Sequence, residues 1–98
     1  MKKNKALEIL SNNPRLLEDY QISALYLFGS VVRDEAGPES DVDILVEFKS
    51  DSHVGLFHMT RLQQVLNSLL GCNTDLVTPD ALHPMLKDKI IGEAIRAA

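Results

Sequence analysis

The hydrophobic pattern of the first third of the chain predicts a helix followed by a buried strand. Over residues 5–17, apolar residues recur at helical spacing, although Pro14 interrupts the pattern. The run ISALYLFG, residues 22–29, is aliphatic and aromatic, carries no charge and ends in glycine, which indicates a buried strand. Ser30 then occupies a helix N-cap position, so a short helical turn over VVRDEA is expected.

A second strand is predicted over residues 41–48, DVDILVEF. Successive side chains of a strand point to opposite faces of the sheet. The two faces are formed by Asp41, Asp43 and Leu45 on one side and by Val42, Ile44 and Val46 on the other. Because the strand continues as an apolar stretch, we expect it to be central in the sheet.

The chain after this strand predicts a helix, a strand and a closing helix. Residues 56–70 carry leucines and valine at helical spacing, and Gly71 provides a stop signal. CNTDLVT, residues 72–78, is predicted to be a third strand. Asp80 is expected to cap a last helix that runs to about residue 96, with Pro84 in its first turn. Its inward face is predicted to consist of Leu82, Leu86, Ile90, Ile91 and Ala94.

The order of elements and the composition limit the fold class. Three strands flanked by helices predict a small α/β or α+β domain, and 98 residues leave room for one domain spanning residues 1–98. A net charge of −4 argues against non-specific binding of nucleic acid as the main role. The charge does not exclude a triphosphate bound through metal ions, because the metals supply positive charge.

The single cysteine and the N-terminus bear on the compartment. Cys72 stands alone, which excludes a disulfide framework and a multi-cysteine zinc site. The basic N-terminus is not followed by the apolar stretch of a signal peptide. No apolar run approaches the ~20 residues needed to span a bilayer. A cytoplasmic protein is therefore the default expectation.

Asp41 and Asp43 are candidate metal ligands. Residues i and i+2 of a strand point the same way, with Cα atoms roughly 6.5 Å apart, so their carboxylates can converge on a cation. Mg²⁺ usually binds one or two carboxylates together with phosphate oxygens and water. An Asp-x-Asp sequence by itself is common, and it is often a solvated strand end. On the rim of a central strand, however, the two charges repel each other unless a cation lies between them.

Gly29 and Ser30 form a second candidate element. Glycine allows a backbone to approach a phosphate closely, and the first N–H groups of a following helix point at the anion. The hydroxyl of Ser30 can add a donor. Taken alone, Gly-Ser is more simply a strand-to-helix turn with a serine cap, because it lacks the lysine and the glycine spacing of a P-loop.

The combination of these elements resembles a known family. Gly-Ser, ten intervening residues and then Asp-x-Asp is the motif of the nucleotidyltransferases of the DNA polymerase beta superfamily. LYLFGSVVRDEAGPESDVDILVEF, which includes Ser40 before the aspartates, is similar in particular to the minimal nucleotidyltransferases. The likeness extends through the long amphipathic helix and the strand carrying Asp75 to a closing Ile-x-x-Glu-Ala helix. It implies the small mixed sheet with flanking helices of that family.

The resemblance implies a role for each matched carboxylate. Asp41 and Asp43 would be the metal-binding pair. Asp75 falls at the third carboxylate of the family, on a strand expected beside theirs, where it would complete a second metal site and help activate the attacking hydroxyl. The simpler alternative for Asp75 is a charge at a strand edge.

The resemblance also implies how phosphates are bound. Gly29 and Ser30 would cradle the β- and γ-phosphates, and Arg33 would neutralise a phosphate or contact the acceptor. The alternative for Arg33 is a surface charge. The family often has glycine directly after this arginine, whereas this chain has Asp34.

The implied activity is metal-assisted transfer of a nucleotide, with ATP as substrate and two Mg²⁺ ions as cofactors. Minimal nucleotidyltransferases are commonly encoded beside a HEPN-domain protein in toxin–antitoxin modules, where they are the antitoxin and adenylylate a HEPN tyrosine. The resemblance therefore implies a protein adenylyltransferase, with a site completed by this partner or by an oligomer. The alternative is a binding module, an antitoxin that neutralises its partner by stoichiometric contact without transfer.

Overall fold

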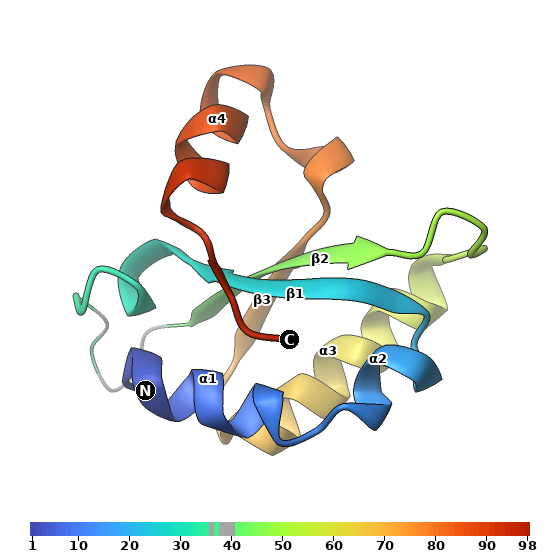
Figure 1. Cartoon of the computed structure of the whole chain (residues 1–98), viewed down its shortest axis with the longest axis horizontal. Helices are drawn as coiled ribbons and strands as arrows, with labels where there is room; N and C mark the ends of the chain where they lie inside the picture. The colour runs from blue at the N-terminus through green and yellow to red at the C-terminus, as the bar shows by residue number, and fades with distance from the viewer. Residues whose placement is uncertain (36, 38–40) are drawn as a thin grey trace.

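A mixed four-stranded sheet forms the centre of the structure (Figure 1), a computed structural model that describes residues 1–35, 37 and 41–98. The strand order is β3-β2-β1-β4. Antiparallel pairing joins β1 to both β2 and β4, whereas β2 and β3 are parallel. The strands span Ile22–Phe28 (β1), Val42–Phe48 (β2), Thr74–Val77 (β3) and Ile95–Arg96 (β4). The mixed sheet with flanking helices confirms the predicted fold class, and β2 is a central strand as expected.

The helices are divided between the two sides of this sheet (Figure 1). On one side lie α1 (Lys3–Ser11), α2 (Arg15–Asp19) and α3 (Leu56–Leu70), and on the other lies α4 (Pro84–Glu93). Short 3₁₀ turns cover Gly29–Val31 (η1) and Pro79–Ala81 (η2). Among the described residues, none of the helices has the length and apolarity needed to cross a lipid bilayer.

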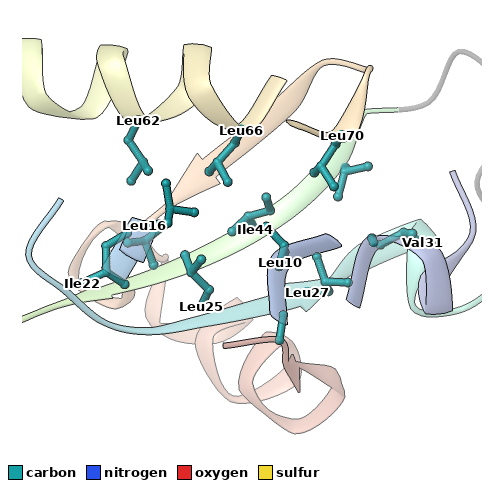
Figure 2. Packing of buried hydrophobic residues seen from close by; sticks show 14 residues of the cluster. Leu10, Leu16, Ile22, Leu25, Leu27, Val31, Ile44, Leu62, Leu66 and Leu70 are labelled. Atoms are coloured by element: carbon teal, nitrogen blue, oxygen red, sulfur yellow. The ribbon is translucent and has the colours of Figure 1, made fainter. Parts of the chain in front are cut away.

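The hydrophobic core lies between the sheet and helices α1 to α3. Figure 2 shows Leu62, Leu66 and Leu70 on one face of α3, directed at the aliphatic side chains of the sheet. Their spacing of four residues places them on one side of the helix, which is why the predicted amphipathic pattern is correct over the whole of α3. Gly71 ends the helix in the left-handed conformation, with φ of 70°.

The alternation predicted for β2 is also confirmed. Val42, Ile44 and Val46 belong to the core cluster on the α1–α3 side. Leu45 points to the opposite side, where it lines a hollow beneath α4. Asp43 lies two residues before Leu45 and therefore shares this second face.

The first predicted helix is two helices in the structure. Helix α1 ends at Ser11, and Pro14 stands at the N-cap of α2. Proline has no N–H and its ring clashes with the carbonyl four residues earlier, so one continuous helix over residues 5–17 is prevented. Leu10 from α1 and Leu16 from α2 still reach the same core.

The helical turn predicted after β1 is shorter in the structure and begins one residue earlier than its predicted cap. The described chain forms only η1, and Ser30 lies inside this turn rather than at its cap. The next residues turn sharply, since Asp34 has a left-handed backbone with φ of 57°. Ala36, the last residue of the predicted turn, lies outside the described residues, as do Pro38, Glu39 and Ser40 of the loop predicted over residues 37–40.

The closing helix differs most from prediction. Helix α4 is capped by His83, whose ring accepts a hydrogen bond from the Met85 N–H (3.2 Å), whereas Asp80 lies in η2. None of its residues is buried, and on the predicted inward face Leu86 and Ile91 are 53% and 49% exposed. After α4 the chain adopts an extended conformation and forms β4, a strand that the periodicity did not predict. Backbone bonds join Ala97 N–H to the Leu25 carbonyl (2.8 Å) and Leu25 N–H to the Ala98 carbonyl (3.1 Å).

We expect the two sides of the sheet to differ in what they contribute to stability. Leu66→Ala removes a fully buried side chain and should lower the free energy of unfolding by about 2–5 kcal/mol. Met85→Ala on α4, where the side chain is 84% exposed, should change it by less than about 0.5 kcal/mol. Urea unfolding followed by circular dichroism measures both, and equal effects would contradict this placement of the core.

Candidate active site

Antiparallel pairing of β1 with β2 brings Gly29 against Asp43. In the register of the two strands Phe28 lies opposite Asp43, and Gly29 is the next residue. Gly29 has φ of 76°, and a β-carbon at this position would overlap Oδ2 of Asp43. Both the backbone conformation and the close approach of the carboxylate therefore require glycine here.

Parallel pairing of β2 with β3 places a second carboxylate beside the first. Asp43 and Asp75 are partners in the register of these strands. Side chains at paired positions point to the same face of the sheet, so the two acids are neighbours. Burial of Asp43 raises the pKa of its carboxyl, and the negative charges of Asp75 and Asp41 raise it further. The site therefore concentrates negative charge that a cation would relieve.

Asp41 lies just outside the strand that was predicted to begin with it. Strand β2 begins at Val42, so Asp41 precedes the paired region and is exposed. It is near enough to raise the pKa of Asp43. Across the described ranges, no three His, Cys, Asp or Glu side chains are gathered closely enough to hold a metal ion by themselves. The donor set at hand is thus the Asp43–Asp75 pair, which suits a Mg²⁺ ion whose other ligands are phosphate oxygens and water.

The candidate phosphate-binding residues follow Gly29 in the turn. Ser30 is half-buried within η1. Arg33 lies just beyond η1, and its guanidinium bonds to Glu35 through Nε (3.1 Å) and to Glu93 through Nη1 (3.0 Å). These two carboxylates raise the pKa of Arg33 above its already high value, so the side chain is a permanent cation.

Glu93 is a residue of this site that sequence reasoning missed. It is the last residue of α4, and its Oε1 accepts a hydrogen bond from the Gly29 N–H (2.9 Å) as well as from Arg33. The available signal was the closing Ile-x-x-Glu-Ala pattern, in which glutamate is the one charged member. Its sequence separation from Gly29 is too large for local spacing to reveal the contact.

Asp34 explains the departure from the expected glycine. Its φ of 57° lies in the left-handed region, where glycine is unstrained and aspartate is one of the better tolerated side chains. The Asp34 side chain is also exposed, so its carboxylate is not buried together with the acidic pair.

A carboxylate pair beside a glycine turn on a mixed sheet is an arrangement suited to nucleotide chemistry, and comparison with known proteins gives the class. Residues 8–97 match the family model described as the nucleotidyltransferase domain. This match covers nearly the whole chain, so the chain belongs to that family and is a transferase by class.

Two curated relatives that match most of this chain are described as protein adenylyltransferases. Protein adenylyltransferase MntA of Thermococcus cleftensis is 32% identical over 87 residues, which are 89% of this chain and 86% of that protein. MJ0435 of Methanocaldococcus jannaschii, described as a protein adenylyltransferase, is 38% identical over 80 residues, 82% of this chain and 84% of that protein.

Solved structures confirm the minimal nucleotidyltransferase fold. A structure described as a minimal nucleotidyltransferase is 32% identical, has a TM-score of 0.80 and covers 97% of this chain and 95% of its own. A toxin–antitoxin structure with AMP-PNP is 25% identical, has a TM-score of 0.72 and covers 90% of this chain and 72% of its own.

The conformation of Asp34 predicts an unusual stabilising substitution. Asp34→Gly removes the strain of a left-handed side chain and should raise the free energy of unfolding by up to about 1 kcal/mol. Asp34→Val should lower it by about 1–2 kcal/mol, because a branched side chain does not fit this conformation. Asp34→Asn, which removes only the charge, should stay close to wild type. Urea unfolding measures all three, and a destabilised Asp34→Gly would contradict the assigned backbone.

The raised pKa of Asp43 predicts that its charge destabilises the metal-free protein. A carboxyl with a raised pKa in the folded state binds its proton more tightly there, so stability falls as pH rises through that pKa. At pH values above the raised pKa, Asp43→Asn should therefore raise the midpoint of thermal unfolding in EDTA by a few degrees.

The difference between Asp43→Asn and wild type should disappear below the ordinary pKa of an aspartate, where both side chains are neutral. Asp88→Asn provides the control, because Asp88 is an exposed acid on α4. A midpoint for Asp43→Asn at or below that of wild type at neutral pH would show that the repulsion is absent.

Proposed function

We propose that this protein is a Mg²⁺-dependent protein adenylyltransferase that transfers AMP from ATP to a tyrosine hydroxyl of a HEPN-domain partner and so acts as an antitoxin. The observation that carries the proposal is the pairing of Asp43 with Asp75 directly beside Gly29. A carboxylate pair and a turn able to approach a phosphate are the two requirements for positioning a metal-bound triphosphate.

The carboxylates would hold the metal. Asp43 and Asp75 lie on adjacent strands with their side chains on the same face. Asp41 acts electrostatically on Asp43 and would have to move closer to add a third oxygen donor. Two bound Mg²⁺ ions would lower the pKa of the acceptor hydroxyl and neutralise charge on the phosphates. For this chain the consequence is that Asp43, Asp75 and Asp41 act as ligands, and none of them is a covalent nucleophile.

The turn and its arginine would hold the triphosphate. The hydroxyl and N–H of Ser30 can donate to phosphate oxygens, and the permanent charge of Arg33 favours an anion beside η1. In the transfer step the acceptor oxygen bonds to the α-phosphorus and the bond from that phosphorus to the bridging oxygen breaks. Pyrophosphate leaves with its electron pair, and the hydroxyl proton passes to a base.

A protein acceptor is supported by the relatives and by the shape of the site. The curated relatives that match most of this chain are named as protein adenylyltransferases. A toxin–antitoxin structure with AMP-PNP and a further toxin–antitoxin structure of MntA, each 25% identical to this chain, share its fold. Asp75 is exposed and Asp43 is half-buried, so a partner surface can approach the carboxylate pair.

The second candidate is a binding module that neutralises its partner by stoichiometric contact. Exposed apolar side chains at the start of α3, Leu56 (80%) and Phe57 (83%), favour contact with another protein. The two candidates differ in whether neutralisation needs ATP and the aspartates. The catalytic candidate is favoured by the pairing of Asp43 with Asp75 beside Gly29, because contact through Leu56 and Phe57 does not require that arrangement.

The test is transfer of label from ATP. With Mg²⁺, a lysate of the source cell and ATP labelled at the α-phosphate, the wild type should label a discrete protein band, and ATP labelled at the γ-phosphate should not. Asp43→Asn should reduce labelling at least ~100-fold, because a group that acts in the transition state is removed. Asp88→Asn should label as wild type does.

Two results would contradict the proposal. Label from γ-phosphate would indicate a kinase, since that phosphoryl group is absent from AMP. Neutralisation of the HEPN partner by Asp43→Asn without ATP, with no label from either position, would support the binding module.

A further inference from the structure

The Glu93 carboxylate connects three parts of the site that are distant in sequence. Its Oε1 accepts hydrogen bonds from the Gly29 N–H (2.9 Å) and from Arg33 Nη1 (3.0 Å), and Oε2 accepts from the same Nη1 (3.1 Å). Glu93 is also the residue at which α4 ends. One side chain therefore fixes the turn, the arginine and the end of a helix relative to one another.

The contact with Glu93 is the better shielded of the two ion pairs of Arg33. The Glu93 side chain is 23% exposed, whereas Glu35, which binds Nε of the same arginine, is 63% exposed. An ion pair between exposed side chains contributes little, because solvent screens it and both side chains lose freedom. Glu93 is thus the partner expected to determine where the guanidinium lies.

We propose that Glu93 is a positioning residue for triphosphate binding, which holds the Gly29 turn and the Arg33 guanidinium in fixed relation before the nucleotide arrives. This inference rests on the proposed function, since it assumes that the turn and Arg33 contact the phosphates. Arginine loses much rotational freedom when it binds a phosphate, and a side chain already ordered by Glu93 loses less.

Electrostatic repulsion alone predicts that loss of Glu93 would strengthen triphosphate binding, the opposite of the effect expected from positioning. A carboxylate near a triphosphate repels it, so removing Glu93 would tighten binding if repulsion dominated. The negative charge of Glu93 lies against Arg33, however, although the exposed Glu35 shares the same arginine, and Arg33 also lies within electrostatic range of Asp43. Without Glu93 the guanidinium is free to turn toward the acidic pair and away from the phosphates. We therefore expect positioning to outweigh repulsion, and the sign of the effect decides between them.

Helix α4 gives the contact a structural reason. No residue of α4 is buried, and a hollow of about 320 Å³ lies between the helix and the sheet, lined by Ile91 and Ala94 on one side and Tyr26 and Leu45 on the other. Apolar packing therefore holds this helix weakly. The polar contacts of Glu93 tie its last turn to Gly29, and the strand pairing of β4 follows directly.

The substitution Glu93→Gln separates the two contacts of the carboxylate. Its amide oxygen can still accept from the Gly29 N–H, whereas the negative charge is lost and an NH₂ group, which donates, replaces the Oε2 that accepts from Arg33 Nη1. Titration calorimetry with Mg²⁺ and AMP-PNP should give a Kd about three- to tenfold higher than for wild type, the range expected when one ordered side chain becomes mobile. Asp88→Asn, which removes the same charge from the exposed side of α4, should leave the Kd unchanged.

An Arg33→Met background distinguishes positioning from general support of the fold. If Glu93 acts through Arg33, Glu93→Gln should cause no further weakening when the arginine is absent. Glu35→Gln, which removes only the exposed partner of Arg33, should change the Kd less than twofold. Thermal unfolding of each variant confirms that the titrated protein is folded, and Glu93→Gln is chosen over alanine because it preserves the Gly29 contact.

Three outcomes would overturn the inference. Glu93→Gln that binds as well as or better than wild type would show that repulsion dominates or that the contact does not matter. Equal weakening in both backgrounds would show that Glu93 only supports the fold. Absence of binding by the wild type would overturn the proposed function together with this inference, whereas wild-type binding that is unaffected by Glu93→Gln would overturn the inference alone.

Discussion

The site depends on two like charges held together by strand pairing. Parallel register places Asp75 beside Asp43, and the pKa of the Asp43 carboxyl is raised first by burial and then by the negative charge of Asp75. Hydrogen bonds of the β2–β3 ladder and the apolar face of β2 must offset this cost. Val42 and Ile44, on either side of Asp43 in the chain, are both buried in the core. The same strand thus supplies the stability on one face and the destabilising charge on the other.

The glycine turn is a consequence of this arrangement. Because β1 pairs with β2 so that Phe28 lies opposite Asp43, the chain must leave β1 through the space beside the Asp43 carboxylate. Gly29 is the residue that can do so, since a β-carbon would overlap that side chain. The Gly-Ser and Asp-x-Asp elements therefore pack against each other at Gly29 and Asp43, and the ten residues between the two elements connect adjacent antiparallel strands in the sequence.

Local pattern predicted the parts of the fold that local forces determine. Helix α3 and strands β1 and β2 follow from apolar spacing, and Gly29, Asp43 and Asp75 meet as the motif indicated. The last twenty residues were predicted poorly, because leucines and isoleucines at helical spacing suggested burial that α4 does not achieve. Strand β4 forms through pairing with Leu27 and Tyr26, and Glu93 reaches Gly29 across 64 positions. Such contacts depend on the folded sheet, so sequence spacing carries no record of them.

The sheet divides its faces between stability and chemistry, and this division explains why the acidic face is left partly open. Burial already raises the pKa of the Asp43 carboxyl, so closer apolar packing of α4 around that residue would favour the protonated form, which binds a cation poorly. Helix α4, which is attached mainly by polar contacts at its end, covers the face of Asp43 and Asp75 without excluding water from it. The weak apolar packing of α4 is therefore compatible with the charged pair, and the hydrogen bonds of Glu93 supply an attachment for the end of the helix.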